Sequence, residues 1–313
     1  MRLWLDDNIK ENLKACNDEE NYFKLQLVEY KLKIKRLKQL VLPHLPNDFN
    51  LEHFIENQSG LPTIYAITPT YLRPTQKAEL TRLSQSFLLI PNFHWIVVED
   101  SREKTDKVSK LLRRSSLSYT HLNIATPAKY KLSDVDPSWL KPRGVIQRNL
   151  GITWLREHFT PKTANGVVYF ADDDNTYDIR LFEEMRYTKR VSVWPVGLVG
   201  GLLLEGPVVQ NNTVTGWITA WKTNRPFAID MAGFAVNLSF LLEHPKASYN
   251  LTVPRGYQES YFLQKLVSLD QLEPKASKCT MVLVWHTRTE KAKLNNELVL
   301  QQRGQHSNHG VEV

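Results

Sequence analysis

The feature that most constrains the fold is a strand, a helix and a second strand within about forty residues. The β-branched run TIYAITPT (63–70) reads as a strand, PTQKAELTRLSQSFLLI (74–90) has helical spacing of apolar residues, and HWIVVED (94–100) reads as a second strand. A connection through a helix makes two such strands parallel. The chain is therefore predicted to be an α/β protein with a mostly parallel, Rossmann-like sheet flanked by helices.

The same pattern returns later in the chain. A helix-like run, RGVIQRNLGITWLREHF (143–159), leads into the apolar strand GVVYFA (166–171), which ends in three aspartates. Ligands of open α/β sheets bind beyond the carboxyl ends of the strands. The first candidates for a binding site are therefore the residues at or just past the three strand ends: Thr68, Pro69, Thr70, Tyr71, Glu99, Asp100, Asp172, Asp173 and Asp174.

The three adjacent carboxylates need an explanation, because like charges repel unless a cation, basic neighbours or solvent balance them. Mg²⁺ or Mn²⁺ held by one or two carboxylates completes its shell with water and substrate phosphate oxygens. The motif DDDN thus favours a divalent cation and a diphosphate-bearing substrate. A solvated acidic turn or a helix cap remains an alternative.

Basic residues and one further carboxylate suit such a substrate. Arg143, Arg148 and Arg288 offer guanidinium forks for phosphates and carboxylates, and His286 shares one side of an extended segment with Arg288. Glu259 begins a helical pattern in GYQESYFLQKL. If it faces the metal it is a candidate general base, although a helix-cap role is the plainer interpretation. His286 has a similarly plain alternative as a hydrogen-bonded residue at the rim of the core.

The string TAWKTNRPFAIDMAGF (219–234) mixes Trp221, Arg225 and Asp230. An aromatic face with charged groups beside it suits a carbohydrate acceptor, and a core aromatic is the alternative. The chain contains no G-x-x-x-x-G-K-[ST], G-x-G-x-x-G or G-x-S-x-G motif. Kinase, Rossmann dehydrogenase and α/β-hydrolase functions therefore lose their main support.

Composition divides the chain into two regions. Residues 1–60 are polar and helix-prone, and the basic stretch at 24–40 fits a solvated helix, a coiled-coil stem or a membrane-surface segment. Residues 61–313 have the compact pattern of strands and helices, which ends in a polar tail at 291–313. No apolar run reaches the length of roughly 18 residues that a membrane span requires.

The net charge and the number of cysteines exclude few classes of protein. The net charge of +7 permits nucleic-acid binding but is its only support. The two cysteines, Cys16 and Cys279, are too few for a disulfide framework or a four-cysteine zinc site. N-x-S/T triplets, which are compatible with a secretory-pathway protein, occur at Asn57, Asn211, Asn237 and Asn250.

Taken together, these residues resemble the animal β-1,3-glucuronyltransferase family. The matching strings run in order from about residue 63 to 293 and include TPTY, HWIVVEDS, PRGVIQRN, VVYFADDDNTYD, RPFAIDMAGFAVNL, GYQES and LVWHTRTEK. The resemblance implies a GT-A type nucleotide-diphospho-sugar fold. It implies that residues 61–313 are the catalytic domain, with a donor-binding half at about 61–190, an acceptor-binding half at about 191–290 and a tail at 291–313. It also implies transfer of glucuronic acid from UDP-glucuronate to the 3-hydroxyl of a terminal galactose, with inversion at the anomeric carbon.

The resemblance implies a role for each matching residue. Glu259 would be the base, and Asp174 would carry Mn²⁺ between the two phosphates. The donor would be held by Pro69, Tyr71, Asp100, Arg143, Arg148, Asp172, Asp173, Asp230, His286 and Arg288. The acceptor would meet Glu205, Trp221 and Arg225, and Asn296 from the tail of the partner in a homodimer.

The acceptor and the cellular location also follow from the resemblance. Trp221 resembles the enzymes that act on galactosyl-galactosyl-xylose of the proteoglycan linkage region, whereas RPFAIDMAGFAVNL, GYQES and LNNE look closer to relatives that cap N-acetyllactosamine. The linkage acceptor is favoured, because a side chain under the sugar weighs more than distant strings. An inactive glycan-binding homologue is a further alternative, against which Glu259 and Asp174 argue. Family members are Golgi membrane proteins with a lumenal catalytic domain, so that location is expected here.

Overall fold

The computed structural model describes residues 60–132, 136, 140–290 and 292–309. The basic stretch at 24–40, predicted to be helical or stem-like, lies outside the described residues. Among the helices that are described, none combines the length and the apolar character needed to cross a membrane.

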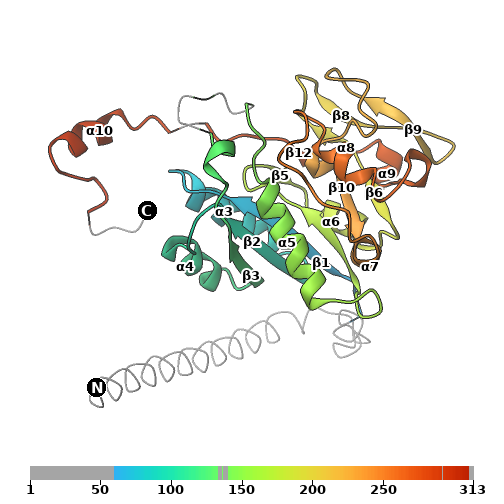
Figure 1. Ribbon diagram of the computed structural model, residues 1–313, viewed down its shortest axis with the longest axis horizontal. Coiled ribbons are helices and arrows are strands. Elements are labelled where there is room, and N and C mark those ends of the chain that lie inside the picture. The colour runs from blue at the N-terminus through green and yellow to red at the C-terminus, as the bar shows by residue number, and fades with distance from the viewer. Residues whose placement is uncertain (1–59, 133–135, 137–139, 291, 310–313) are drawn as a thin grey trace, which may run out of the picture. The chain divides into compact units, whose positions relative to one another are not determined.

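The centre of the described part is a seven-stranded sheet with the order β11-β6-β10-β4-β1-β2-β3 (Figure 1). Its strands are β1 (Thr63–Thr70), β2 (Phe93–Glu99), β3 (Ser118–Asn123), β4 (Gly166–Phe170), β6 (Val191–Val193), β10 (Phe234–Asn237) and β11 (Glu273–Pro274). The four strands β4, β1, β2 and β3 are parallel, as are β11 and β6, whereas β10 is antiparallel to both of its neighbours. The predicted mostly parallel sheet is thus confirmed.

Helices cover both faces of this sheet, which explains why its strands are apolar almost throughout. On one face lie α3 (Gln76–Phe87), α4 (Asp106–Arg114) and α6 (Arg180–Arg186), and on the other α5 (Val145–His158), α7 (Leu238–Glu243) and α8 (Gln258–Leu263). Successive residues of β1 serve the two faces in turn: Ile64 packs with the first group and Tyr65 with the second.

A second, five-stranded sheet with the order β5-β12-β7-β8-β9 lies beside the first (Figure 1). It comprises β5 (Thr176–Tyr177), β7 (Val196–Gly197), β8 (Leu204–Gln210), β9 (Thr213–Ile218) and β12 (Val284–Trp285). β12 is antiparallel to β5, and β5 follows the three aspartates. This pairing brings the segment WHTRTE next to the aspartates, although more than a hundred residues separate them in sequence.

The remaining elements are short. They are the 3₁₀ turns η2 (Ala128–Tyr130), η3 (Met231–Gly233) and η4 (Leu269–Gln271), the turn α9 (Ala276–Cys279) and the tail helix α10 (Asn295–Gln302). Within the apolar run CTMVLVWH (279–286), the strand is confined to β12. Ala276–Cys279, just before it, adopt positive φ angles of 51° to 64° and turn the chain. The polar tail contains α10.

Candidate active site

Three parallel strands end side by side and bring the predicted donor residues to one edge of the sheet. The amide of Asp100 donates to Thr70 O at 2.8 Å, and the amide of Ala171 donates to Ile67 O at 3.0 Å. The same edge of the sheet therefore carries Pro69, Tyr71, Asp100 and the aspartates after Ala171, as the sequence predicts. Tyr71 is 44% exposed there, so its ring is available to a ligand.

Two of the strand-end candidates are structural instead. Glu99 is buried and accepts hydrogen bonds from the amide and the hydroxyl of Thr105, at 3.0 and 2.8 Å, besides pairing with His121. Thr68 accepts from the indole of Trp95 at 2.9 Å inside the core. Both side chains point to the face of the sheet that α3 and α4 cover, where these contacts hold them away from the open edge. The candidacy of Glu99 and Thr68 for the site was therefore wrong.

Asp100 is held differently and stays at the edge. Its carboxylate accepts from the amide and from the hydroxyl of Thr126, both at 2.7 Å, and Gln147 donates to the same hydroxyl at 3.2 Å. Thr126 thus fixes the orientation of Asp100. No motif marked Thr126 in the sequence.

Asp173 lies in a buried network that sequence reasoning only partly anticipated. It accepts from the Thr70 hydroxyl at 2.7 Å and pairs with Arg73 at 2.7 Å. Arg73 also pairs with the buried Glu79, and its guanidinium carbon lies 4.5 Å from the centre of the Tyr71 ring. Burial raises the pKa of Asp173 to about 6, although Arg73 and Thr70 oppose the shift.

Asp172 forms an ion pair with Arg148, which projects from the first turn of α5. Arg148 also donates to Arg143 O at 3.0 Å, while Arg143 itself is exposed. Gly144 precedes α5 with φ +70°, and a Cβ there would lie 2.6 Å from Arg148 Nη1 and 3.0 Å from Pro69 Cγ. Glycine at this position therefore lets Arg148 reach Asp172.

Asp174 is the one of the three aspartates whose carboxylate has no ion-pair or hydrogen-bond partner among the described residues. Its backbone oxygen accepts from Thr287 at 2.6 Å and from Arg82 at 3.4 Å. Burial, followed by the charges of Asp172 and Glu79, raises the pKa of the carboxyl. A bound cation would offset the cost of burying the Asp174 carboxylate and its repulsion from Asp172 and Glu79.

No group of three or more His, Cys, Asp or Glu side chains in the described part of the chain could form a metal cage. Mg²⁺ and Mn²⁺ do not require one, since one or two carboxylates, water and substrate phosphates complete their shells. Asp174 therefore fits such an ion, with substrate oxygens supplying the remaining ligands.

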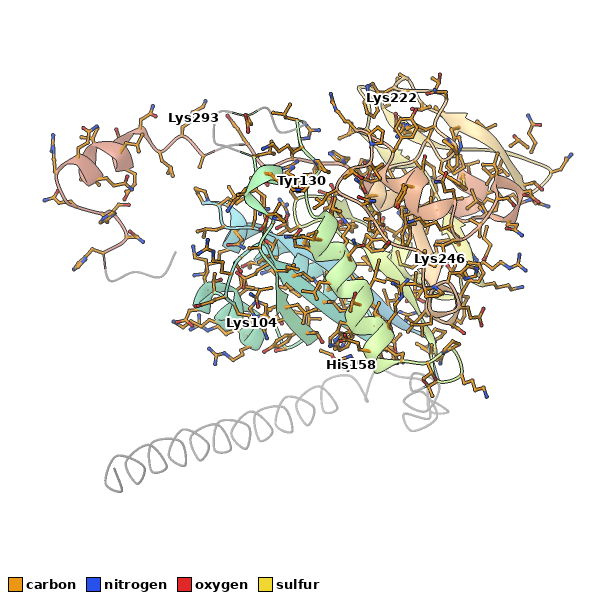
Figure 2. All side chains as sticks on the ribbon, in the orientation of Figure 1. Lys104, Tyr130, His158, Lys222, Lys246 and Lys293 are labelled. Carbon is orange, nitrogen blue, oxygen red and sulfur yellow. The ribbon has the colours of Figure 1, made fainter. Side chains whose placement is uncertain are left out.

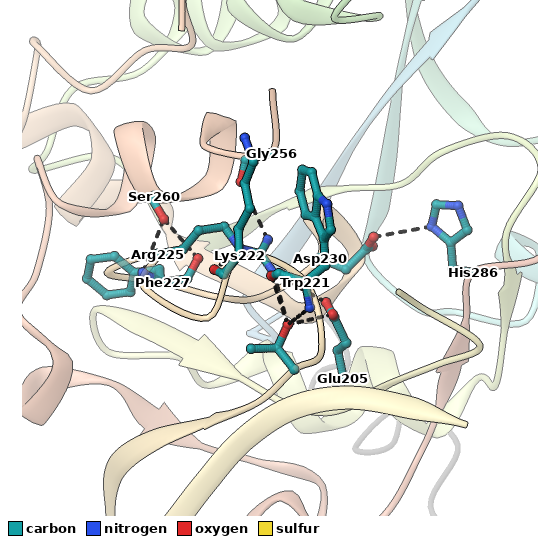
Figure 3. Close-up of polar contacts among 10 residues, drawn as sticks. Glu205, Trp221, Lys222, Arg225, Phe227, Asp230, Gly256, Ser260 and His286 are labelled. Atoms are coloured by element: carbon teal, nitrogen blue, oxygen red, sulfur yellow. Dashed lines mark hydrogen bonds and ion pairs between the residues drawn. The ribbon is translucent and has the colours of Figure 1, made fainter. Parts of the chain in front are cut away.

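A cavity of about 860 Å³ adjoins these aspartates, and seven of the predicted residues line it: Glu205, Trp221, Arg225, Asp230, Glu259, His286 and Arg288. On one side, His286 Nδ1 lies 3.2 Å from Asp230 Oδ2 (Figure 3). The hydrogen bond to Asp230 raises the pKa of His286. Burial would raise the pKa of Asp230, but His286, the Ala232 amide and Arg148 together outweigh it and the pKa is lowered. Both shifts favour the charged forms of the pair, an imidazolium facing a carboxylate.

Glu259 lies in the first turn of α8 and opens into the same cavity. Burial, followed by repulsion from Asp230, raises its pKa to about 7. A carboxylate with a pKa near neutrality can accept a proton from a hydroxyl at physiological pH. The helix-cap alternative is thus compatible with a chemical role, because the side chain faces the cavity rather than the helix amides alone.

The opposite wall of the cavity is built from β8, β9 and the loop after β9. The Thr219 hydroxyl donates to Glu205 at 2.6 Å, and Arg225 lies 3.6 Å from Glu205 and donates to the same hydroxyl at 3.2 Å (Figure 3). Trp221 stands over this pair, with the Arg225 guanidinium 5.4 Å from its ring centre. Gly256 packs so closely that a Cβ there would lie 1.9 Å from Trp221 Cζ3. The wall offers an indole face beside a buried ion pair.

Two groups of predicted residues thus emerge, one at the sheet edge and one around the cavity. They are joined by Thr287, which lines the cavity and hydrogen-bonds the backbone of Asp174. Asn296 lies on the exposed helix α10 and does not line the cavity in the described chain. Sequence reasoning missed Arg73, Thr126 and Thr287. Thr287 could have been suspected from its place between His286 and Arg288.

Comparison with known proteins gives concordant results. Residues 83–290 match the model of glycosyltransferase family 43. The chain is 55% identical over 263 residues to mouse galactosylgalactosylxylosylprotein 3-beta-glucuronosyltransferase 3, a match that covers 81% of this chain and 78% of that protein. It is 53% identical over 259 residues to the Drosophila melanogaster protein named galactosylgalactosylxylosylprotein 3-beta-glucuronosyltransferase I, covering 81% and 84%.

A further relative is similar to the same degree, and a solved structure is similar only distantly. Rat galactosylgalactosylxylosylprotein 3-beta-glucuronosyltransferase 1 is 57% identical over 240 residues, covering 76% of this chain and 72% of that protein. Among solved structures, Staphylococcus aureus TarS (residues 1–349) aligns with a TM-score of 0.46 and 15% identity, covering 72% of this chain and 60% of that one, which is too distant to add to the argument.

Proposed function

The chain belongs to glycosyltransferase family 43, and from this premise we propose that it transfers glucuronic acid from UDP-glucuronate to the 3-hydroxyl of a terminal galactose. The favoured acceptor is the galactosyl-galactosyl-xylose of the proteoglycan linkage region, because that trisaccharide is in the names of the relatives. The observation that carries the proposal is the cavity in which Glu259, the His286–Asp230 pair and Trp221 meet beside the three aspartates.

The nucleoside of the donor would lie at the sheet edge. Tyr71, whose ring is exposed, would contact the base, and Asp100, which Thr126 orients, would accept from it. Asp173, fixed by Arg73 and Thr70, would accept from ribose hydroxyls. Arg143, which is exposed nearby, would also contact the nucleoside.

The sugar and the diphosphate would extend into the cavity. His286 and Arg148 would face the glucuronate, with Asp230 and Asp172 accepting from its hydroxyls. Arg288 would bind the diphosphate. Because Arg148 and His286 already pair with Asp172 and Asp230, the sugar carboxylate would be a second anionic partner for them.

Displacement requires a base on the acceptor side. Glu259 would accept the proton of the attacking hydroxyl as the new glycosidic bond forms and the bond to UDP breaks. With the base and the leaving group on opposite sides of the sugar, as proposed, a single displacement would invert the anomeric centre. Trp221 would hold the acceptor against Glu259, with Glu205 and Arg225 beneath it.

We infer that Asp174 would hold Mn²⁺, the cofactor that the resemblance implies. Bound there, the ion would act as a Lewis acid on the charge that builds on the departing diphosphate. The support is the unpartnered carboxylate of Asp174 among the described residues and its raised pKa. Thr287 would fix the position of Asp174 relative to Arg288, because its hydroxyl donates to the backbone oxygen of Asp174 and Arg288 is the next residue in the chain.

We also infer a homodimer in which the tail of one copy, including Asn296, covers the cavity of the other. In the described part of the tail every residue of α10 is at least partly exposed, and Leu298 is 57% exposed. At the mouth of the cavity Leu198 is 54% exposed and the neighbouring Leu203 is 86% exposed. Apolar side chains exposed at both places favour association. Golgi membrane localisation remains a prediction from the family resemblance.

The test is transfer of labelled glucuronate from UDP-glucuronate to galactosyl-β-1,3-galactose and to N-acetyllactosamine, with and without Mn²⁺, for wild type and Glu259→Ala. We expect Mn²⁺-dependent transfer to the first acceptor, reduced by about 10²- to 10⁴-fold in the variant. Preference for N-acetyllactosamine would reassign the acceptor. UDP binding without transfer to either acceptor would instead favour an inactive glycan-binding protein.

A further inference from the structure

A second cavity, of about 420 Å³, lies against the outer side of α8. Tyr257 and Tyr261 line it, one helical turn apart, with the amide of Tyr261 donating to Tyr257 O at 2.8 Å. Asn250 and Gln264 add side-chain amides to its wall. The volume falls in the range of roughly 300–1,000 Å³ that is usual for small-ligand sites. This cavity plays no part in the function proposed above.

The second cavity continues from the acceptor wall of the first. Lys222, which lies on the side of the molecule formed by β8 and β9 (Figure 2), places its ammonium 4.9 Å from the ring centre of Trp221 and 5.2 Å from that of Tyr257. The two ring centres are therefore no more than about 10 Å apart. Lys222 therefore links the ring of Trp221, which lines the first cavity, to the ring of Tyr257, which lines the second.

Chemistry identifies the kind of ligand that fits the second cavity. Each described residue that lines it is uncharged, and the polar ones are hydroxyl or amide side chains beside two tyrosine rings. Aromatic faces bind the apolar faces of sugar rings, while amides and hydroxyls bind sugar hydroxyls. Lys222 and Lys265 contact the two tyrosine rings from outside this lining, and within the lining a neutral saccharide finds both kinds of contact.

Tyr261 is held as a platform for such a contact. Lys265 Nζ lies 3.6 Å from its ring centre, and the Asn250 amide donates to its hydroxyl at 3.4 Å. Asn250 is itself fixed, because its side-chain oxygen accepts from the amide and the hydroxyl of Thr252, both at 3.0 Å. A ring fixed before binding loses little conformational entropy when a ligand stacks on it.

We propose that this cavity is a distal subsite for the neutral sugar units of the acceptor that follow the two galactoses, with Tyr257 and Tyr261 as its stacking residues. The inference rests on the proposed function, since it presumes a glycan seated on Trp221. With such a subsite, the length of the acceptor would determine the affinity of the protein for it. The chain would bind a longer acceptor more tightly without any change at the reacting hydroxyl.

The experiment measures kcat and KM with three acceptors: galactosyl-galactose, galactosyl-galactosyl-xylose, and that trisaccharide on a serine peptide. Asn250 begins an N-x-T triplet, so the protein is produced without glycosylation to keep the cavity open. For wild type we expect KM to be about three- to tenfold lower for the trisaccharide than for the disaccharide, with similar kcat, and no further gain from the peptide.

The readout for each variant is the ratio of kcat/KM for the trisaccharide to that for the disaccharide, which cancels any loss common to both acceptors. Tyr261→Ala should bring this ratio close to one, and Tyr261→Phe, which keeps the ring, should retain most of it. Tyr187→Ala is the matched control, because Tyr187 is 58% exposed at the end of α6 on the other face of the sheet. If Tyr261→Ala lowers the melting temperature, Gln264→Ala replaces it as the test of the subsite, because Gln264 lines the same cavity at an exposed position.

The outcomes separate the inference from the function on which it rests. No transfer by wild type to any acceptor would overturn the proposed function. Transfer with equal KM for the disaccharide and the trisaccharide would overturn the distal subsite and leave the function standing. A gain that appears only with the peptide would assign the cavity to polypeptide instead. Saturation-transfer NMR should also show contact to xylose protons in wild type and lose it in Tyr261→Ala.

Discussion

Glu259 shows how one environment sets the chemistry of one residue. Burial and the nearby Asp230 raise its pKa to about 7, so its carboxylate forms only as the pH passes neutrality. We expect kcat/KM to fall about tenfold per pH unit below about pH 7, because the proposed base is then protonated. The measurement is the pH profile of transfer from about pH 5.5 to about pH 8.5. An acid limb centred near the ordinary glutamate pKa would contradict the assignment.

The same shift makes a prediction about stability. The folded state binds the Glu259 proton more tightly than the unfolded state does, so the free energy of unfolding declines as the pH rises from about 4.5 to about 7. Glu259→Gln removes the ionisation and should stabilise the protein by about 1–3 kcal/mol at about pH 8, and hardly at all at about pH 4.5. Urea unfolding at both pH values measures the difference.

A suitable control is Glu103→Gln, at an exposed glutamate, for which we expect little change at either pH. Equal stabilisation of Glu259→Gln at both pH values would show that the gain does not come from ionisation. An inactive variant that is more stable than wild type would fit a residue kept for the reaction rather than for the fold.

Among the structural elements, the turn that leads into α8 sets the position of the acceptor wall. Gly256 has φ +80°, and a Cβ there would lie 1.9 Å from Trp221 Cζ3. Gly256→Ala should therefore displace the Trp221 ring and raise the acceptor KM by about tenfold or more, with UDP affinity little changed. Steady-state kinetics and UDP titration separate the two effects.

Gly201 provides a matched control for the backbone strain that the Gly256→Ala variant introduces. It has φ +79°, but a Cβ there would meet nothing within 4 Å. Gly201→Ala bears the same left-handed strain of about 1–2 kcal/mol without the contact on Trp221. If both variants raise the acceptor KM equally, loop strain is responsible and the packing argument fails.

The elements also show what could be predicted from the sequence. The β-branched run of β1, the helical period of α3 and the apolar run of β2 suffice to predict a parallel sheet, and hence the edge where Asp100 and the three aspartates meet. The hydrogen bond from Thr287 to Asp174 depends on the pairing of β12 with β5, two-residue strands with no pattern of their own. Arg73 is likewise placed by tertiary packing, which no local spacing reveals.

For the whole molecule, the remaining question is which copy completes which site. The proposed homodimer places the tail of one copy over the cavity of the other, so a chain that ends at residue 293 should lose acceptor turnover while it still binds UDP. Mixed with full-length Glu259→Gln, which has the tail but not the base, it should regain activity, because a heterodimer then combines an intact Glu259 with a partner's tail. Transfer assays of each chain alone and of the mixture, with sedimentation to follow dimers, decide it. A truncated chain that is a fully active monomer would refute the shared site, as would a mixed dimer without activity.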